Sequence, residues 1–191
     1  MVQIYVVRFC TIAVSYNMFL PSWRFSLKIF AVRGIKKSGK TTTVSNIISE
    51  LTARGYKVGS IKYIHHSDFE MDSPNTDTWK HRNAGAVAVT ARANHETSLL
   101  FPEKLPLEKI FSIYDDIVDW VVLEGVDEAI VPTVITAHTE EDLKQKWTDQ
   151  VFCISGRISA VIDKCCGLPA IDSTTNVKGL VDYIENKFKN K

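Results

Sequence analysis

The feature that most constrains this chain is a glycine-rich segment at residues 34–41, which reads G-I-K-K-S-G-K-T. Residues 28–33, just before it, are mostly apolar and rich in strand-forming types, which predicts a buried strand. After it, apolar residues recur at helical spacing through residues 41–54, and Gly55 supplies a stop signal. A strand, a G-x-x-x-x-G-K-[ST] loop and a helix in this order are typical of a phosphate-binding loop.

The chemistry of such a loop assigns roles to its side chains. The glycines would let the backbone bend around a phosphate, while consecutive N–H groups and the helix dipole attract the anion. Lys40 would reach the β- and γ-phosphates, and the Thr41 hydroxyl would bind Mg²⁺. The competing interpretation is a glycine turn that carries a lysine by chance, but the flanking strand and helix favour nucleotide binding. The predicted nucleotide-binding residues are Gly34, Lys37, Ser38, Gly39, Lys40, Thr41 and Thr42.

A second chemical landmark is the apolar run at residues 119–125, which ends in Glu124 and Gly125. A buried parallel strand with a carboxylate at its C-terminal end is how phosphate-loop proteins place an acid beside Mg²⁺. Glu124 is therefore the predicted catalytic residue and a predicted Mg²⁺ ligand, directly or through water; it would otherwise orient an attacking water. The alternative is an ordinary strand that ends in a solvated acid. The upstream loop pattern favours the functional interpretation.

The segment at residues 64–78 is polar and contains proline, which predicts a loop that follows a second strand at residues 57–63. Ligands of open α/β sheets bind beyond the carboxyl ends of the strands, so we expect this loop to respond to bound nucleotide. Its acids would meet Mg²⁺ or its waters, and its histidines would contact phosphate or a second bound molecule. The alternative is a passive surface connection. The predicted contacts are His65, His66, Asp68, Asp72 and Asp77.

The rest of the chain alternates between strand-like and helix-like segments. Thr76 is a predicted N-cap of a short helix that ends at Gly85, and Thr175 is a predicted N-cap of the last helix, at residues 176–189. Further helices are predicted at residues 107–114 and 139–147, and strands at residues 86–91, 96–101, 151–155 and 169–171. This alternation predicts an α/β fold, a phosphate-loop nucleoside triphosphate hydrolase-like sheet with helices on both faces.

Bulk properties restrict the class of protein. A formal net charge of +1 over 191 residues gives no general case for nucleic-acid binding. The lysines gather locally instead, at Lys36, Lys37 and Lys40, where a polyphosphate would sit. The four cysteines form no C-x-x-C pattern, which favours reduced thiols and a cytoplasmic protein.

The first 26 residues differ in character from the rest. Residues 4–20 are mostly apolar but are interrupted by polar side chains, so neither a membrane span nor a signal peptide is expected. One interpretation is an additional strand or helix that covers a sheet edge. The other, which we favour, is an N-terminal extension (residues 1–26) translated from a misplaced start, with the true start at or near Leu27. The predicted domain therefore covers residues 27–191.

Three segments together resemble the molybdopterin-guanine dinucleotide biosynthesis adapter family, MobB. They are residues 34–42, residues 62–86 and residues 123–125. The first pattern is shared by many nucleotide-binding families, whereas the paired histidines, spaced acids and Ala-Gly-Ala of the second are uncommon. The resemblance covers the chain from about Lys28 to the C-terminus and leaves the N-terminal extension outside.

The resemblance implies a GTP-binding protein, at most a weak GTPase, that assists the guanylylation of molybdopterin in molybdenum cofactor maturation. It also implies a homodimer and association with a guanylyltransferase similar to MobA, and it makes a pterin the second molecule expected near His65 and His66. Mg²⁺ is the expected cofactor because of the phosphate loop and Glu124. No Asn-Lys-x-Asp guanine-reading motif is present, so the preference for guanine rests on the resemblance alone. The chain departs from the family pattern in three places: Asn75 replaces a glycine, Val126-Asp127 replaces Phe-Lys and reverses a charge, and Ser155-Gly156 replaces Ser-Asp.

Two other functions stay open. A small-molecule or nucleotide kinase would use Lys40 and Glu124 for phosphoryl transfer. It would also need an arginine-bearing lid, for which Arg82 and Arg92 are candidates. A metal-binding carrier would hold zinc or nickel with side chains of the polar loop, namely His65, His66, Asp68 and Asp72. Adjacent histidines seldom bind one ion together, so we favour nucleotide binding over this last alternative.

Overall fold

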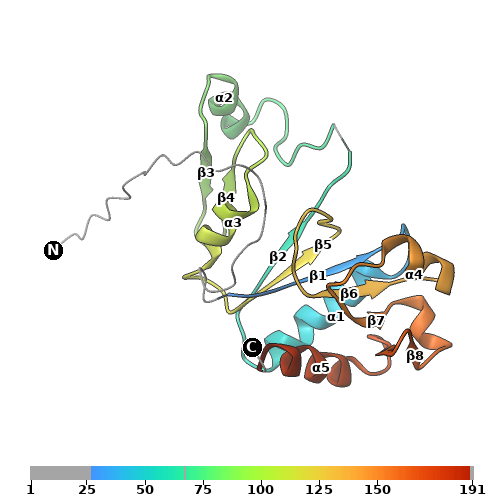
Figure 1. Ribbon diagram of the computed structural model, residues 1–191. Helices are drawn as coiled ribbons and strands as arrows, with labels where there is room; N and C mark the ends of the chain where they lie inside the picture. Colours follow the sequence, from blue (N-terminus) through green and yellow to red (C-terminus); the bar gives the residue numbers. More distant parts are fainter. Residues whose placement is uncertain (1–26, 67, 190–191) are drawn as a thin grey trace, which may run out of the picture.

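A five-stranded parallel sheet forms the centre of this protein (Figure 1). The structure is a computed structural model that describes residues 27–66 and 68–189, so the predicted N-terminal extension lies outside the described residues. In spatial order the strands are β2 (Val58–Lys62), β5 (Trp120–Glu124), β1 (Lys28–Gly34), β6 (Thr133–Thr136) and β7 (Val151–Ser155). The strand before the glycine loop therefore lies in the middle, directly beside the strand that ends in Glu124.

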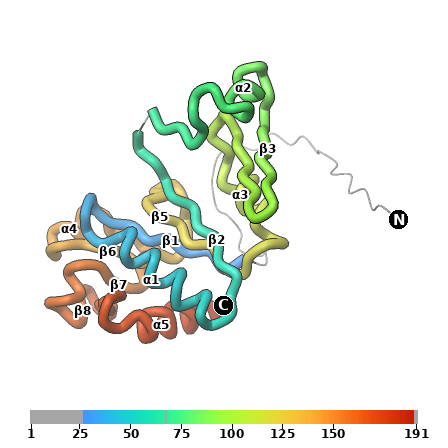
Figure 2. The backbone as a smooth tube through the Cα atoms, turned by 180° about the vertical axis from the view of Figure 1, so that it is seen from behind, coloured from blue at the N-terminus to red at the C-terminus, as the bar shows by residue number. Residues whose placement is uncertain are grey.

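Helices cover both faces of the sheet, as predicted (Figure 2). α1 (Lys40–Ala53) and α5 (Val177–Lys189) pack on one face, together with strand residues such as Phe30 and Val122. α3 (Leu107–Tyr114) and α4 (Glu140–Lys146) bury Phe111 and Leu143 on the other face. The strands are nearly continuous apolar runs because both of their faces are covered. The predicted α/β fold is confirmed.

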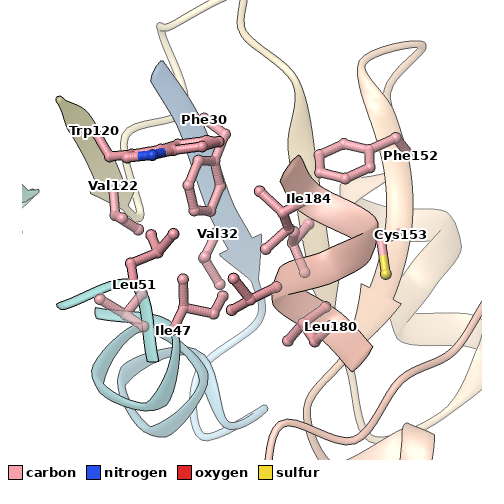
Figure 3. Packing of buried hydrophobic residues seen from close by; sticks show 13 residues of the cluster. Phe30, Val32, Ile47, Leu51, Trp120, Val122, Phe152, Cys153, Leu180 and Ile184 are labelled. Atoms are coloured by element: carbon pink, nitrogen blue, oxygen red, sulfur yellow. The ribbon is translucent and has the colours of Figure 1, made fainter. Parts of the chain in front are cut away.

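The core between the sheet and the α1–α5 pair contains large aromatic rings (Figure 3). Trp120 and Phe30 lie edge to face, with ring centroids 6.0 Å apart and ring planes at 81°. Ile47 and Leu51 from α1 and Ile184 from α5 are fully buried in the same cluster. Burying a side chain of this size contributes about 1.5–3 kcal/mol, so the cluster holds α1, and the loop before it, firmly on the sheet.

A smaller unit lies between β2 and α3 in the chain and stands off the central sheet (Figure 1). It contains α2 (Asp77–Asn83) and an antiparallel hairpin of β3 (Val89–Arg92) and β4 (Thr97–Leu100), which forms a separate sheet. Thr76 caps α2 as predicted, because its hydroxyl accepts a hydrogen bond from the Trp79 backbone N–H. The short helix and the two strands predicted at residues 86–91 and 96–101 are thus confirmed, with slightly shorter strands.

Two strand assignments in the C-terminal third differ from the sequence prediction. β6 has no counterpart in that prediction, since its four buried residues follow a proline and show no alternation. The strand expected at residues 169–171 is wrong in extent. Instead, β8 (Lys164–Cys165) and β9 (Leu168–Pro169) form a small hairpin, and Ala170 makes a single parallel bridge to Ile154.

The predicted cap of the last helix is also wrong by one residue. The Asn176 side chain, rather than Thr175, accepts a hydrogen bond from the Gly179 N–H in the first turn of α5. Asparagine and threonine are both good N-cap residues, so the local pattern could not choose between adjacent candidates.

Three of the four cysteines lie in the described residues. Cys153 is buried, Cys165 is half-buried and Cys166 is exposed, and none of these three forms a disulfide. Within residues 27–66 and 68–189, no helix combines the length and the apolar character that crossing a bilayer requires.

Candidate functional site

At two positions in the junction between β1 and α1, only glycine fits. Gly39 caps α1 in the left-handed region, with φ 99°. Gly34 has φ 154°, and a Cβ there would lie 2.1 Å from the carbonyl oxygen of Thr136. The strand, loop and helix predicted around residues 34–41 are confirmed, and the glycine loop packs closely against β6.

Ser38 anchors this loop from inside. Its side chain is fully buried, and its Oγ lies 2.7 Å from Thr136 Oγ1. The Thr136 hydroxyl in turn donates to the Arg33 carbonyl at 3.1 Å, which ties the end of β6 to the end of β1. Because the Ser38 side chain is committed to this contact, its predicted role toward nucleotide would fall to its backbone N–H, which here donates a long hydrogen bond to the Ile35 carbonyl at 3.4 Å.

Lys40 is the first residue of α1, and its side chain folds back over the loop. Its ammonium group donates to the Gly34 carbonyl at 3.0 Å and to the Ile35 carbonyl. Burial lowers the pKa of Lys40 from its ordinary value, and the nearby Glu124 carboxylate opposes that shift. An ammonium group held at the N-terminus of a helix, above a glycine loop, is well placed to bind a polyphosphate.

Thr41, Glu124 and Lys62 meet at the C-terminal edge of the sheet. The Thr41 hydroxyl donates to Glu124 Oε1 at 2.6 Å. Lys62, the last residue of β2, places its ammonium nitrogen 2.9 Å from the same oxygen and 3.3 Å from Thr41 Oγ1. Strand register explains the meeting, because Glu124 of β5 lies opposite Lys62 of β2 and opposite Val32 of β1.

These oxygen atoms fit the predicted magnesium ion. A hydroxyl and a carboxylate side by side are the hard donors that Mg²⁺ takes beside a bound phosphate. Thr41 and Glu124 are therefore the residues that would hold the metal. The sequence analysis did not assign Lys62 a role in this site. It showed a charged residue near the end of a predicted strand, but it did not reveal that this strand lies beside the one that ends in Glu124.

A cavity of about 690 Å³ opens beside the glycine loop, within the size range of small-ligand sites. Of the residues predicted to bind nucleotide, the cavity is lined by Lys37, Gly39, Lys40, Thr41 and Thr42. The rest of the lining comes mainly from residues to which the sequence analysis gave no binding role: Gly156, Arg157 and Ala160 after β7, and Asp172, Ser173 and Thr174 before α5. Segments more than a hundred residues apart thus share one cavity with the predicted phosphate loop.

Gly156 gives a physical reason for one departure from the family pattern. Its φ is 78°, and a Cβ at this position would lie 2.3 Å from the Ser38 carbonyl oxygen. The Arg157 N–H donates to that same oxygen at 3.2 Å. In this chain a side chain at position 156, the usual aspartate included, would collide with the glycine loop.

A second departure brings an acid to the site's periphery. Asp127, in the position where the family usually has lysine, lies 2.8 Å from the Lys146 ammonium of α4. Arg33, which is buried, donates to the carbonyl of Ala129 in the same segment. The reversed charge at position 127 is therefore compensated by a lysine from another element.

The predicted contacts of the polar loop lie outside this cavity. His65 packs edge-on against Tyr63, with ring centroids 4.8 Å apart. Asp72 accepts hydrogen bonds from the hydroxyls of Thr76 and Thr78, and Asp77 pairs with Lys80 across one turn of α2. His66 and Asp68 are exposed. Among the described residues, none from 64–77 lines the cavity, and the response of this loop to nucleotide stays a prediction.

The same geometry bears on the two alternative functions. In the described parts of the chain, no three histidine, cysteine or acidic side chains are grouped so as to hold a metal ion. Arg82, a candidate lid residue for a kinase, pairs with Glu70 at 3.0 Å, and Arg92 lies on β3. Neither arginine lines the cavity. No observation of the described residues therefore favours the metal carrier or the kinase.

Comparison with known proteins places these features in a family. The family model described as "Molybdopterin guanine dinucleotide synthesis protein B", or MobB, matches residues 29–162. The molybdopterin-guanine dinucleotide biosynthesis adapter protein of Haemophilus influenzae is 24% identical over 165 residues, which cover 84% of this chain and 89% of that protein. A putative adapter protein of the same description from Methanocaldococcus jannaschii is 34% identical over 105 residues, 54% of this chain and 43% of that protein.

Solved structures show the same fold. The crystal structure of Bacillus subtilis MobB superimposes with a TM-score of 0.69 at 24% sequence identity, covering 83% of this chain and 96% of that one. A MobB homolog from Bacillus stearothermophilus gives a TM-score of 0.64 at 19% identity, covering 85% and 99%. Since the family model spans the glycine loop, β5 and the segment between them, the chain belongs to the MobB family.

Proposed function

We propose that this chain binds GTP and Mg²⁺ at the β1–α1 loop and serves as an adapter in molybdopterin guanine dinucleotide biosynthesis. The observation that carries the proposal is the convergence of Lys40, Thr41 and Glu124 at one edge of the sheet, beside the cavity. Membership of the MobB family supplies the pathway, because the relative from Haemophilus influenzae is named an adapter protein of that biosynthesis.

Different residues of the site would bind different parts of a magnesium-bound triphosphate. The N-terminus of α1 attracts the anion, and the Lys40 ammonium can exchange its two carbonyl partners for phosphate oxygens. Thr41 and Glu124 would hold the metal, which supplies positive charge to the phosphates when bound. Lys62 adds a second ammonium group at the same edge, within reach of both metal-binding side chains.

The proposal includes weak GTPase activity at most. Glu124 is the acid that would orient an attacking water, but its Oε1 is engaged by both Thr41 and Lys62. Arg82 and Arg92, the arginines considered for a lid that would stabilise a phosphoryl-transfer transition state, do not line the cavity. Arg157 does line it, but it follows β7, on the other side of β1 from Glu124. Such a site favours binding of nucleotide over its hydrolysis.

The partners of the proposed adapter follow from its family rather than from its contacts. We include a homodimer and association with a guanylyltransferase similar to MobA, in a cytoplasmic setting. Light scattering of the purified chain tests the dimer. A guanylylation assay with the transferase, molybdopterin and Mg-GTP, run with and without this chain, tests the adapter role, and product yield that ignores the chain would contradict it.

Titration with a fluorescent GTP analogue tests the nucleotide site. Lys40→Ala should weaken binding by roughly 10- to 100-fold, because a charge-assisted hydrogen bond is worth about 1.5–3 kcal/mol. Thr41→Ala should weaken it less. Lys80→Ala, which removes an exposed lysine on α2, serves as control and should bind like the unmodified chain. Unchanged GTP affinity in Lys40→Ala, with an unchanged melting temperature, would exclude the loop as the phosphate site.

A further inference from the structure

The part of the cavity lining that follows β7 and precedes α5, which we call the far wall, carries a single acid. Among the described residues that line it, Asp172 is the only one with a carboxylate. Asp172 follows the bridge that links Ala170 to β7, so it lies beyond the carboxyl ends of the strands, like the glycine loop. A carboxylate is a poor neighbour for phosphates, which indicates that this end of the cavity takes a different part of the ligand.

The order of the strands gives the direction of a bound nucleotide. The metal-binding side chains lie at the end of β5, and the glycine loop follows β1. β6 and then β7 come next on the other side of β1. A triphosphate held by Lys40 with its terminal phosphate near Glu124 therefore extends its nucleoside away from β5, toward Arg157 and Asp172 on the far wall.

The loop that carries Asp172 is held in place by three side-chain contacts. The Ser155 hydroxyl donates to the Ile171 carbonyl at 2.8 Å, just before Asp172. The Asn46 side chain of α1 donates to the Ser173 carbonyl at 2.9 Å, and the Ser173 hydroxyl lies 3.3 Å from Thr43 Oγ1. The loop is thus fixed to both β7 and α1, the elements that also form the rest of the cavity.

The Asp172 carboxylate is oriented and ionised. Its Oδ1 accepts hydrogen bonds from the Thr174 N–H at 2.8 Å and from the Thr174 hydroxyl at 2.7 Å. Hydrogen bonds from Thr174 and Thr175 lower the pKa of Asp172 below its ordinary value. Since both Thr174 bonds use Oδ1, Oδ2 offers further acceptor sites to a ligand.

We infer that Asp172 is the residue that reads the guanine base, accepting hydrogen bonds from the N1–H and the 2-amino group. The inference rests on the proposed function, because it assumes a nucleotide at the glycine loop. Guanine presents two adjacent donors that match the two oxygens of a carboxylate. Oδ2 is open to one of them, and Oδ1 opens to the other when the Thr174 hydroxyl rotates away and leaves only the Thr174 N–H on that oxygen. Adenine presents a lone pair at N1 and no donor at C2, so the same carboxylate repels it. Asp172 would therefore supply the guanine preference that no Asn-Lys-x-Asp motif provides here.

Asp172→Asn tests the inference by exchanging one acceptor for a donor. Xanthine carries a carbonyl where guanine carries its 2-amino group, so an asparagine amide matches xanthine and mismatches guanine. Binding of fluorescent GTP, XTP and ATP analogues is measured with Mg²⁺ present. The unmodified chain should prefer GTP, whereas Asp172→Asn should bind GTP at least tenfold more weakly and XTP more tightly. The ratio of the two affinities should change by roughly 100-fold.

Two control variants separate this inference from the proposed function. Asp163→Asn, at an exposed aspartate outside the cavity lining, should keep the affinities of the unmodified chain for all three analogues. Lys40→Ala should weaken all three alike, because it acts on the phosphates. If the unmodified chain binds none of them, the proposed function fails. If it binds them and Asp172→Asn leaves their ratios unchanged, or weakens all three equally, nucleotide binding stands and the reading of guanine by Asp172 is overturned.

A measurement without any substitution covers the case in which Asp172→Asn does not fold. Inosine triphosphate lacks the 2-amino group of GTP but keeps N1–H and the phosphates. The unmodified chain should bind it roughly tenfold more weakly than GTP, the effect of one lost charge-assisted hydrogen bond. Equal affinities for inosine triphosphate and GTP would overturn the inference.

Discussion

The ammonium group of Lys62 lies 2.9 Å from the Glu124 carboxylate oxygen that would otherwise face Mg²⁺. The Lys62 side chain is about half exposed, at 51%, whereas the Glu124 side chain is only 10% exposed. The acid is therefore fixed by the sheet, and the lysine is the partner that can move. The Thr41 hydroxyl donates to the same Glu124 oxygen. The Lys62 ammonium and Mg²⁺ therefore compete for the same two ligand oxygens, those of Thr41 and Glu124.

This competition predicts the effect of Lys62→Met on magnesium dependence. Removing the ammonium should lower the Mg²⁺ concentration that half-saturates GTP binding by about fivefold, since a half-exposed ion pair is worth about 1 kcal/mol. GTP titrations at a series of Mg²⁺ concentrations measure it, with Lys80→Met as the control lysine. An unchanged or increased Mg²⁺ requirement in Lys62→Met would show that this lysine does not compete with the metal.

Glu124→Gln should separate hydrolysis from binding. The amide keeps the shape of the side chain and an oxygen for the Thr41 hydroxyl, but it loses the charge. We expect the slow Mg²⁺-dependent GTPase rate to fall by at least roughly 100-fold, the usual contribution of a positioned acid or base, while GTP affinity changes less. Phosphate release under single-turnover conditions gives the rate, with the exposed Glu141→Gln as control. Equal rates in both proteins would make Glu124 a structural residue.

Gly156 and Gly167 form a matched pair for testing how the segment after β7 supports the glycine loop. Both have positive φ, 78° and 81°, but a Cβ at Gly156 would lie 2.3 Å from the Ser38 carbonyl, whereas a Cβ at Gly167 has nothing within 4 Å. Gly167→Ala should cost about 1 kcal/mol of backbone strain and lower the melting temperature by about 2–4 °C. Gly156→Ala should cost clearly more and also weaken GTP binding. Equal losses of stability and of GTP affinity in the two variants would mean that the segment after β7 accommodates a side chain at position 156 without disturbing the glycine loop.

The buried thiol of Cys153 predicts an alkaline loss of stability. Burial raises the pKa of Cys153 from 9.0 to about 12, so the folded chain keeps the proton that the unfolded chain releases. Between about pH 9 and pH 12 the free energy of unfolding should therefore fall with pH, with a contribution of up to about 1.4 kcal/mol per unit from this residue. Below pH 9 both states hold the proton and the contribution vanishes.

Denaturant unfolding from pH 7.5 to 10.5 compares the unmodified chain with Cys153→Ala. The alanine variant loses some packing at every pH, but its stability should decline less steeply above pH 9. Cys166→Ala, at an exposed position, is the control and should keep the slope of the unmodified chain. Parallel pH profiles for Cys153→Ala and the unmodified chain would contradict the prediction.

The sequence determined the local part of this protein. The strand, glycine loop and helix around residues 34–41, the cap at Thr76 and the helix at residues 107–114 all appear as predicted. Each rests on side chains that act within a few residues of one another: periodic apolar positions, a capping hydroxyl, a glycine at a helix end. The predicted proximity of Thr41 and Glu124 is also confirmed, because Glu124 ends a buried parallel strand and Thr41 lies in the first turn of the helix that follows the glycine loop.

Only the tertiary structure decided which other residues reach the site. Strand order places Lys62 beside Glu124, carries the loop at residues 64–77 away from the cavity, and brings Gly156 and Asp172 to the glycine loop. The short strand β6 also becomes recognisable only between β1 and β7. The spacing of apolar residues shows which face of a helix or strand is buried. It does not show which other element covers that face, because that depends on packing across the whole chain. Such packing depends on contacts between residues far apart in sequence, so no local pattern contains it.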